Sequence, residues 1–313
     1  MLAAPAQPPL GGISPIESGA PRLSKGRGPK RIIVNADDLG LSRGITDGIL
    51  LSHLKGIVTS ASLMMNQPAT EYAVKRLGDE VRTLDVGIHL NLCQGSPVLA
   101  PSSVPSLVGG DGRFLPPPEM ARRLVRWQVA PKEIEAEFCA QIDRMLSYGL
   151  TPSHADSHHR FHIYPPAALV FGRAIRSRGI FRARSAKKKT WPEEGLGAAH
   201  AGSFYRRVTV NAYNHVLQGA LFRGLKAPDA GVALHPRFRG KLAELPKAWC
   251  FAFENMPPGT YEIWCHPGFR EKGFSETDPL YAQREVELAM LTDSRLAETM
   301  KVRGIQLVNF EAL

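Results

Sequence analysis

Short apolar runs that end in carboxylate or imidazole side chains constrain this fold more than any other feature of the sequence. The first run, residues 32–34, predicts a buried strand that delivers Asp37 and Asp38 where it reaches the surface. Three later segments repeat the pattern: residues 85–92 with His89, residues 153–162 with four of the ten histidines, and residues 261–268 with His266. In a (β/α) barrel the catalytic groups come from the C-terminal ends of several strands. The pattern therefore predicts an α/β barrel with a site at one end.

The length and the order of the expected elements agree with this fold class. A single (β/α) barrel commonly needs about 250 residues, and the chain has 313. Apolar spacing predicts helices and strands that alternate, with no internal repeat. The expected elements are helices over 42–55, 70–77, 132–148, 165–178 and 283–303, a broken loop over 95–118, a strand from Ile180, and a final strand over 305–310. This alternation favours a parallel sheet that closes, or nearly closes, into a barrel.

Amino-acid composition gives expectations for the N-terminal tail and for the cysteines. Residues 1–30 are rich in proline, glycine and small residues and become basic toward their end, so we expect a disordered tail. The tail has no apolar core typical of a secretory signal, and no run of about 18 apolar residues predicts a membrane span. Four cysteines lack the close spacing of a metal or disulfide framework. We therefore expect free thiols and a cytoplasmic protein.

Two neighbouring aspartates on a stiff element need a cation or a proton between them. Asp37 and Asp38 would otherwise repel each other, so one of them is expected to bind a metal while the other keeps a catalytic proton. Imidazole ligands suit zinc and similar ions, whereas carboxylate-rich sites suit magnesium or calcium. The histidines at the other strand ends can supply the imidazoles.

Each of these features also has a purely structural interpretation. The aspartate pair is typical of a helix N-cap, and His89 is typical of a satisfied core histidine. The cluster from His154 to His162 also fits a solvated polar loop or an adventitious metal scavenger, and His266 fits a simple turn. Four such coincidences at strand ends in one chain favour a mononuclear metal hydrolase.

Four motifs together resemble a known family. They are Asn35-Ala-Asp-Asp-Leu-Gly40, Gly87-Ile-His-Leu-Asn-Leu92, His154-Ala-Asp-Ser-His-His159 and Cys265-His-Pro-Gly268. In this combination the chain resembles the YdjC-like carbohydrate deacetylases, which include the chitooligosaccharide deacetylases, from about Arg31 to Leu313. The resemblance implies a distorted (β/α) barrel in a single catalytic domain over residues 31–313.

The resemblance also implies roles for individual residues. It implies that Asp38, His89 and His158 bind one divalent metal ion, zinc or magnesium, that Asp37 is the general base, and that His266 is the general acid or an oxyanion partner. One departure is visible, because many relatives have three consecutive histidines after Asp-Ser, and here the third is Arg160. This position lies outside the implied metal triad, so it puts substrate contacts in doubt rather than metal binding.

The resemblance implies removal of an N-acetyl group from an N-acetylhexosamine-containing carbohydrate or glycolipid, with release of acetate. Amide hydrolysis needs a nucleophile stronger than bulk water, and a metal held by two imidazoles and one carboxylate supplies it. Asp156 is a candidate for orienting an imidazole from behind, or for stabilising a local turn. The alternatives are a metal hydrolase of another amide or ester, and a non-catalytic basic binding protein that keeps a remnant site.

The net charge of +10 reflects basic residues concentrated between residues 173 and 241. Runs of charge are usually solvated faces, and the chain carries no recognisable nucleic-acid module, so no nucleic-acid partner is expected. Residues 191–241 combine apolar, partly helical patterns with basic groups such as Arg206 and Arg207, which predicts a helical, basic insertion. This insertion would suit a lipid-linked or phosphate-linked amino sugar and peripheral membrane contact, or it would form a homodimer interface.

Overall fold

The computed structural model describes residues 28–189, 212–232, 241–271, 278 and 280–313. The expectations for the N-terminal tail, and for much of the insertion over 191–241 with Arg206 and Arg207, lie outside these residues.

A long buried strand, β1 (Lys30–Leu39), lies at the centre of a parallel sheet. The side chains of residues 32–34 are fully buried, as expected for a parallel sheet that is covered on both faces. The sheet order is β4-β3-β2-β1-β7-β6-β5, and β8 pairs with β1 outside this path. The other strands are β2 (Ser60–Leu63), β3 (Asp85–Leu90), β4 (Ala155–Ser157), β5 (Lys188–Lys189), β6 (Ala230–Val232), β7 (Gly259–Cys265) and β8 (Ile305–Val308).

Backbone hydrogen bonds continue from β4 to the other edge of the sheet through an irregular segment. The Arg184 N–H donates to the carbonyl of Ala155 at 3.1 Å, and the Ala183 N–H donates to the carbonyl of Lys226 at 2.9 Å. Farther along the same segment, β5 pairs with β6. The sheet therefore curls on itself, and the prediction of a distorted α/β barrel is confirmed.

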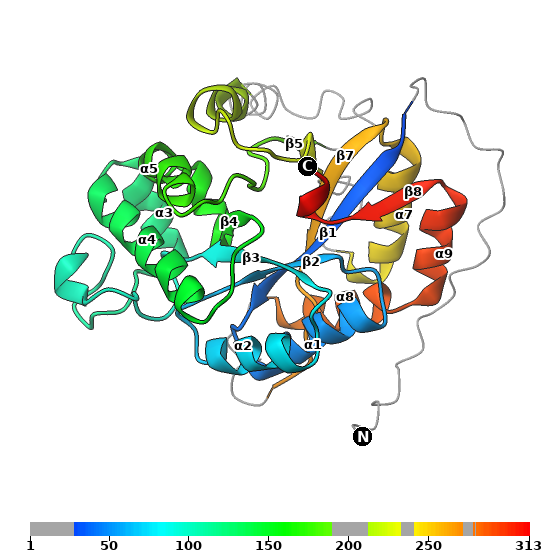
Figure 1. Cartoon of the computed structure of the whole chain (residues 1–313), viewed down its shortest axis with the longest axis horizontal. Coiled ribbons are helices and arrows are strands. Elements are labelled where there is room, and N and C mark those ends of the chain that lie inside the picture. Colours follow the sequence, from blue (N-terminus) through cyan, green and yellow to red (C-terminus); the bar gives the residue numbers. More distant parts are fainter. Residues whose placement is uncertain (1–27, 190–211, 233–240, 272–277, 279) are drawn as a thin grey trace.

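Helices surround the curled sheet, and most of them start where the sequence predicts. Figure 1 shows α3, α4 and α5 grouped beside β4, and α7 and α9 on the side of β7 and β8. The helices are α1 (Arg43–Leu54), α2 (Thr70–Asp79), α3 (Pro117–Val125), α4 (Pro131–Ser147), α5 (Pro165–Arg176), α7 (Leu245–Asn255), α8 (Tyr281–Leu291) and α9 (Ser294–Val302). Proline at the first turn of α3, α4, α5 and α7 fits its fixed φ and missing N–H.

Three details of the predicted order are wrong. The single helix expected over 283–303 is divided into α8 and α9, because the Asp293 side chain accepts a hydrogen bond from the Arg295 N–H and starts a new helix. The loop expected over 95–118 ends in the first turn of α3. The strand expected from Ile180 is limited to single bridges at Arg182 and Ala183 before β5.

The C-terminal residues of the protein close the end of the barrel opposite to the C-terminal ends of the strands. β8 pairs in parallel with residues 30–33 of β1. Beyond it, the Phe310 ring stacks on the His154 imidazole with centroids 3.6 Å apart, and the Phe310 N–H donates to the Asp85 carboxylate at 3.0 Å. Among the described residues, no helix is long and apolar enough to cross a membrane.

Candidate active site

The C-terminal end of β1 carries both aspartates into the interior. A register shift between Ala36 and Leu39 marks a bulge in the β1–β2 pairing, and Asp38 has a φ of 71°. Bulges and left-handed residues re-aim side chains, and aspartate tolerates this region better than most residues. Both carboxylates are buried, with 4% of Asp37 and 1% of Asp38 exposed. The N-cap interpretation is wrong, because Ser42 caps α1.

Asp38 meets two histidines from neighbouring strands, and we call Asp38, His89 and His158 the histidine cluster. One Asp38 oxygen, Oδ1, lies 3.0 Å from Nδ1 of His158 and 3.5 Å from Nε2 of His89. One possible ligand atom from each residue lies within 4.8 Å of the others. The three residues predicted as metal ligands are therefore close enough to share one ion.

Asp156 orients His89 from the side opposite to Asp38. The His89 Nδ1 lies 2.6 Å from the Asp156 carboxylate, and both side chains are buried. Burial alone would lower the pKa of His89, but the negative charge of Asp156 raises it to about 9. A carboxylate behind an imidazole fixes its tautomer and increases its basicity as a ligand. The interpretation of Asp156 as an orienting residue agrees with this geometry better than a turn does.

Two buried atoms of the histidine cluster lack hydrogen-bond partners. They are Oδ1 of Asp38 and Nε2 of His89, and buried polar atoms without partners are uncommon because desolvation is costly. A divalent cation between them would satisfy both, so the cluster fits a metal. A second group of potential ligands, Asp37, His89 and Asp156, also lies within 4.8 Å. It fits less well, because Asp37 and Asp156 already pair with an arginine.

That arginine is Arg184. It stands in the basic region between residues 173 and 241 and was not predicted to lie in the site. We call Arg184, Asp37, Asp156 and Glu262 the arginine cluster. The Arg184 guanidinium binds both Asp37 oxygens at 2.6 and 2.9 Å, the Asp156 carboxylate at 2.6 Å and the Glu262 carboxylate at 2.7 Å. Only 1% of Arg184 is exposed, so the solvated-face interpretation is wrong for this residue.

The pKa of Glu262 differs from that of its neighbour Asp156 in the arginine cluster. Burial raises the pKa of the Glu262 carboxyl to about 7, although Arg184 opposes the shift. Burial would also raise the pKa of Asp156, but Arg184 and His89 hold it well below its ordinary value. One carboxyl of the cluster therefore titrates near neutrality while its neighbour stays ionised.

His266 follows β7 and faces Asp37 from the next strand of the sheet. Its Nε2 lies 4.0 Å from Oδ2 of Asp37, and its Nδ1 lies 3.9 Å from the Glu287 carboxylate of α8. The backbone N–H of His266 also donates to Glu287. A cavity of about 220 Å³ opens beside it, lined by Lys188, Val232, Trp249, Ile263, Trp264, His266, Gln283 and Glu287. His266 is thus held at the edge of a space large enough for part of a substrate, which a simple turn residue would not require.

A second arginine, Arg284 of α8, was also missed by the sequence analysis. Its guanidinium donates to Oδ2 of Asp38 at 2.7 Å and is itself paired with Asp278. Burial would raise the pKa of Asp38, but the charges of His158 and Arg284 hold it well below its usual range. Asp38 therefore stays ionised, as a metal ligand must. Nothing in the spacing of α8 distinguishes Arg284 from a surface arginine.

The other histidines of the 154–162 segment have separate environments. His154 and His162 are fully buried, where His154 stacks on Phe310 and His162 shares a 2.7 Å hydrogen bond with the Ser157 hydroxyl. His159 is exposed at the surface beside His158. The interpretation of the segment as a solvated loop is therefore wrong for three of these four residues.

Outside the site, the described basic residues include ordinary surface pairs. Arg173 binds Glu135 at 2.6 Å, and Arg178 binds Asp143 at 2.9 Å. These contacts agree with the solvated-face interpretation of the basic region. All four cysteines are free, as expected.

Comparison with known proteins places the chain in a family. A family model described as YdjC-like protein matches residues 31–302. The chain belongs to this family. A carbohydrate deacetylase from Geobacillus stearothermophilus is 34% identical over 282 residues, covering 90% of this chain and 97% of the relative. A carbohydrate deacetylase from Brevibacillus brevis is 32% identical, covering 90% and 99%.

A solved structure supports the same fold. A crystal structure from Enterococcus faecalis V583, whose name gives a provisional role in cellobiose-phosphate cleavage, superposes with a TM-score of 0.74 at 25% identity. The match covers 91% of this chain and 99% of that protein. The predicted family is confirmed, and the predicted enzyme class agrees with the names of the relatives.

Proposed function

We propose that this YdjC-like protein is a metal-dependent carbohydrate deacetylase that removes the acetyl group of an N-acetylhexosamine and releases acetate. Two buried atoms that make no hydrogen bond, Oδ1 of Asp38 and Nε2 of His89, carry the proposal. These atoms lie beside Asp37 and His266, which can exchange protons. The relatives named carbohydrate deacetylase supply the substrate class.

In the proposed site, Asp38, His89 and His158 would hold one divalent ion, zinc or magnesium. When bound, such an ion polarises the amide carbonyl and lowers the pKa of water toward neutrality. Asp156 keeps His89 in the orientation that turns Nε2 toward Asp38. The ligands are therefore oriented before the ion arrives.

Asp37 and His266 divide the proton transfers in the proposed mechanism. Arg184 fixes both Asp37 oxygens, so the carboxylate can accept the proton of the attacking water without reorienting. His266, 4.0 Å from Asp37, borders the same space and can protonate the departing amine. Glu287 holds the backbone of His266 in place.

We also propose one catalytic domain over residues 31–313, with a tail over 1–30 and an insertion over about 191–241 that binds substrate. Lys188 and Val232, which line the cavity beside His266, lie just before and within the insertion. A basic insertion that borders the site suits an amino sugar linked to a lipid or a phosphate. Peripheral membrane contact, a homodimer and a cytoplasmic location belong to the same proposal.

The test is hydrolysis by the metal-loaded protein. Zinc-loaded and magnesium-loaded samples should release acetate from N-acetylated chitooligosaccharides or from lipid-linked and phosphate-linked amino sugars. The Asp37→Asn protein should keep its metal and lose at least about a hundredfold in kcat, the scale of a positioned base. A matched control, Asp143→Asn, changes a surface carboxylate and should leave kcat unchanged.

Two results would overturn the proposal. Absence of acetate release from every N-acetylated sugar, with release from another amide or ester, would favour a different hydrolase. Stoichiometric sugar binding with no turnover would indicate a binding protein with a remnant site. Normal turnover by Asp37→Asn would remove Asp37 from the mechanism.

A further inference from the structure

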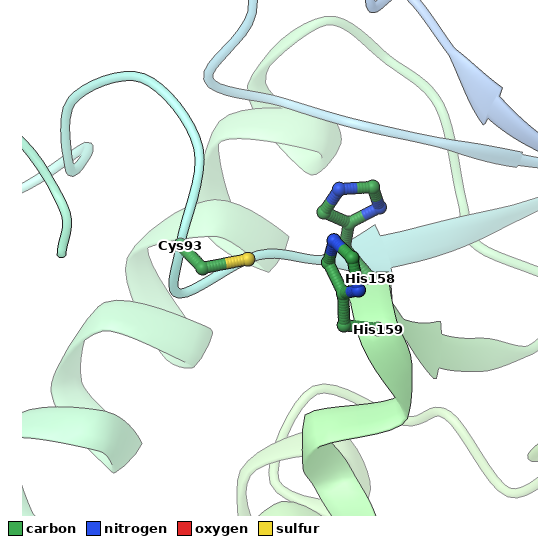
Figure 2. Close-up of side chains that lie close together, drawn as sticks. All are labelled: Cys93, His158 and His159. Atoms are coloured by element: carbon green, nitrogen blue, oxygen red, sulfur yellow. The ribbon is translucent and has the colours of Figure 1, made fainter. Parts of the chain in front are cut away.

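We infer that Cys93, His158 and His159 form a second metal site, which takes a thiol-seeking divalent cation such as zinc or cadmium and thereby inhibits the enzyme. We call these residues the thiol site. One possible ligand atom from each residue lies within 4.8 Å of the others. Figure 2 shows the Cys93 sulfur directed from the loop after β3 toward the two imidazoles that follow β4.

The backbone after β4 is bent in a way that places two consecutive histidines together. His159 and Arg160 have φ values of 52° and 57°, a region that few residues other than glycine adopt. The rings of His158 and His159 meet edge to face, with centroids 4.5 Å apart and planes at 71°. Consecutive residues in an extended strand would point to opposite faces, so this bend is what allows both imidazoles to approach Cys93.

Two side chains of the thiol site, Cys93 and His159, are weakly engaged, whereas His158 is paired with Asp38. The Cys93 thiol makes a long contact of 3.7 Å with the Asn91 side chain, and among the described residues no hydrogen bond to the His159 imidazole is found. His159 is exposed, which gives a cation access to the site. A cation therefore has few interactions to displace when it binds.

The ligand types decide which ions bind. One thiolate with two imidazoles suits zinc and softer ions and does not suit magnesium or calcium. Three side-chain ligands leave at least one coordination position for water. When the thiol binds the cation, the thiol releases its proton to solvent. The thiol site is therefore selective in a way that the histidine cluster, with its carboxylate, is not.

His158 belongs to both sites, and this is the origin of the inhibition. Its Nδ1 lies 3.0 Å from Asp38 in the histidine cluster. An ion held by Cys93 and His159 draws His158 toward the thiol site and places a second positive charge next to the first. Metal binding at the thiol site stands on its own geometry, whereas the inhibition rests on the proposed function.

Cadmium titration of the full-length protein tests the binding. The wild-type protein should develop the ultraviolet charge-transfer absorption of a cadmium thiolate. Cys93→Ser should abolish it, and His159→Gln should weaken cadmium binding at least about tenfold. The matched controls Cys139→Ser and His215→Gln should titrate like the wild-type protein. An absent band in the wild-type protein, or a band that persists in Cys93→Ser, would overturn the thiol site.

Zinc inhibition tests the second half of the inference. Excess zinc should suppress acetate release by the wild-type enzyme, and the concentration for half-inhibition should rise at least about tenfold in His159→Gln. Equal inhibition of both proteins would overturn the inhibitory role. If the protein released no acetate at all, the proposed function would fail, while the cadmium band would still decide whether the thiol site exists.

Discussion

The arginine cluster and the histidine cluster lie side by side at the end of β1, yet their charges are balanced in different ways. Arg184 binds Asp37, Asp156 and Glu262 directly, so the first cluster supplies its own cation. The second cluster has an arginine on one Asp38 oxygen, Oδ2, but leaves Oδ1 of Asp38 and Nε2 of His89 without a hydrogen bond. Two adjacent residues of one strand, Asp37 and Asp38, therefore belong to a cluster centred on an arginine and to a cluster centred on two histidines.

This difference predicts that the two clusters respond differently to the loss and to the addition of a cation. A buried ion network is intolerant of losing one of its members, because a buried charge without a partner is costly. A buried group of ligands without a cation instead gains stability when the cation binds. Four measurements of the free energy of unfolding test this prediction, from the largest expected effect to the smallest.

Removal of the arginine should have the largest effect. Arg184→Met leaves three buried carboxyl groups without their cation, so the free energy of unfolding should fall by about 3–5 kcal/mol. Urea denaturation followed by circular dichroism measures the loss. A decrease below about 1 kcal/mol would show that the arginine cluster does not stabilise the fold.

Addition of a cation should stabilise the histidine cluster. In a Cys93→Ser background, which removes the thiol site, zinc at about 100 times its dissociation constant should raise the free energy of unfolding by about 2.7 kcal/mol. His89→Ala in that background should lose this gain, whereas His215→Ala, at an exposed position, should keep it. Equal stabilisation of the His89→Ala protein would exclude His89 as a ligand.

Glu262 should make the stability of the arginine cluster depend on pH. Burial raises its folded pKa to about 7 from an ordinary 4.5, so the folded protein binds this proton more tightly than the unfolded chain does. The stabilisation is complete below pH 4.5 and is lost as the pH rises through 7. Relative to Glu262→Gln, wild-type stability should fall with pH by up to about 1.4 kcal/mol per unit in this interval. Parallel curves for the two proteins would contradict the prediction.

The smallest effect is expected at a surface arginine. The Arg173 side chain is 63% exposed in its pair with Glu135, and exposed pairs contribute little because water screens them. Arg173→Met should change the free energy of unfolding by less than about 0.5 kcal/mol. A loss comparable to that of Arg184→Met would mean that burial does not distinguish the two arginines.

The sequence predicted the parts of the site that follow regular strands. Residues 32–34 and 85–92 are apolar enough to be identified as buried strands, and Asp38 and His89 stand at recognisable positions along them. The strand pattern therefore predicted that these side chains lie at one end of the sheet, whereas the choice of Asp38, His89 and His158 as one cluster came from the family resemblance. The boundary between α8 and α9 could not, because a single capping side chain, Asp293, decides it within an otherwise helical pattern.

Arg184 could not be predicted for a different reason. It lies in an irregular segment beside Arg182 and Lys187, and this composition is typical of a solvated surface. Its burial depends on carboxylates from β1, β4 and β7 converging on one point, and no local pattern contains that information. Arg284 presents the same difficulty within α8.

The strand order has a consequence for how the protein is made. β1 is synthesised first among the strands, but its neighbours include β7 and β8, the last two strands of the chain. Contacts between distant parts of a sequence form slowly, because the intervening chain must first be ordered. Asp37 and Asp38 therefore lack their final surroundings until the C-terminal residues have left the ribosome, and a truncated nascent chain has no completed site.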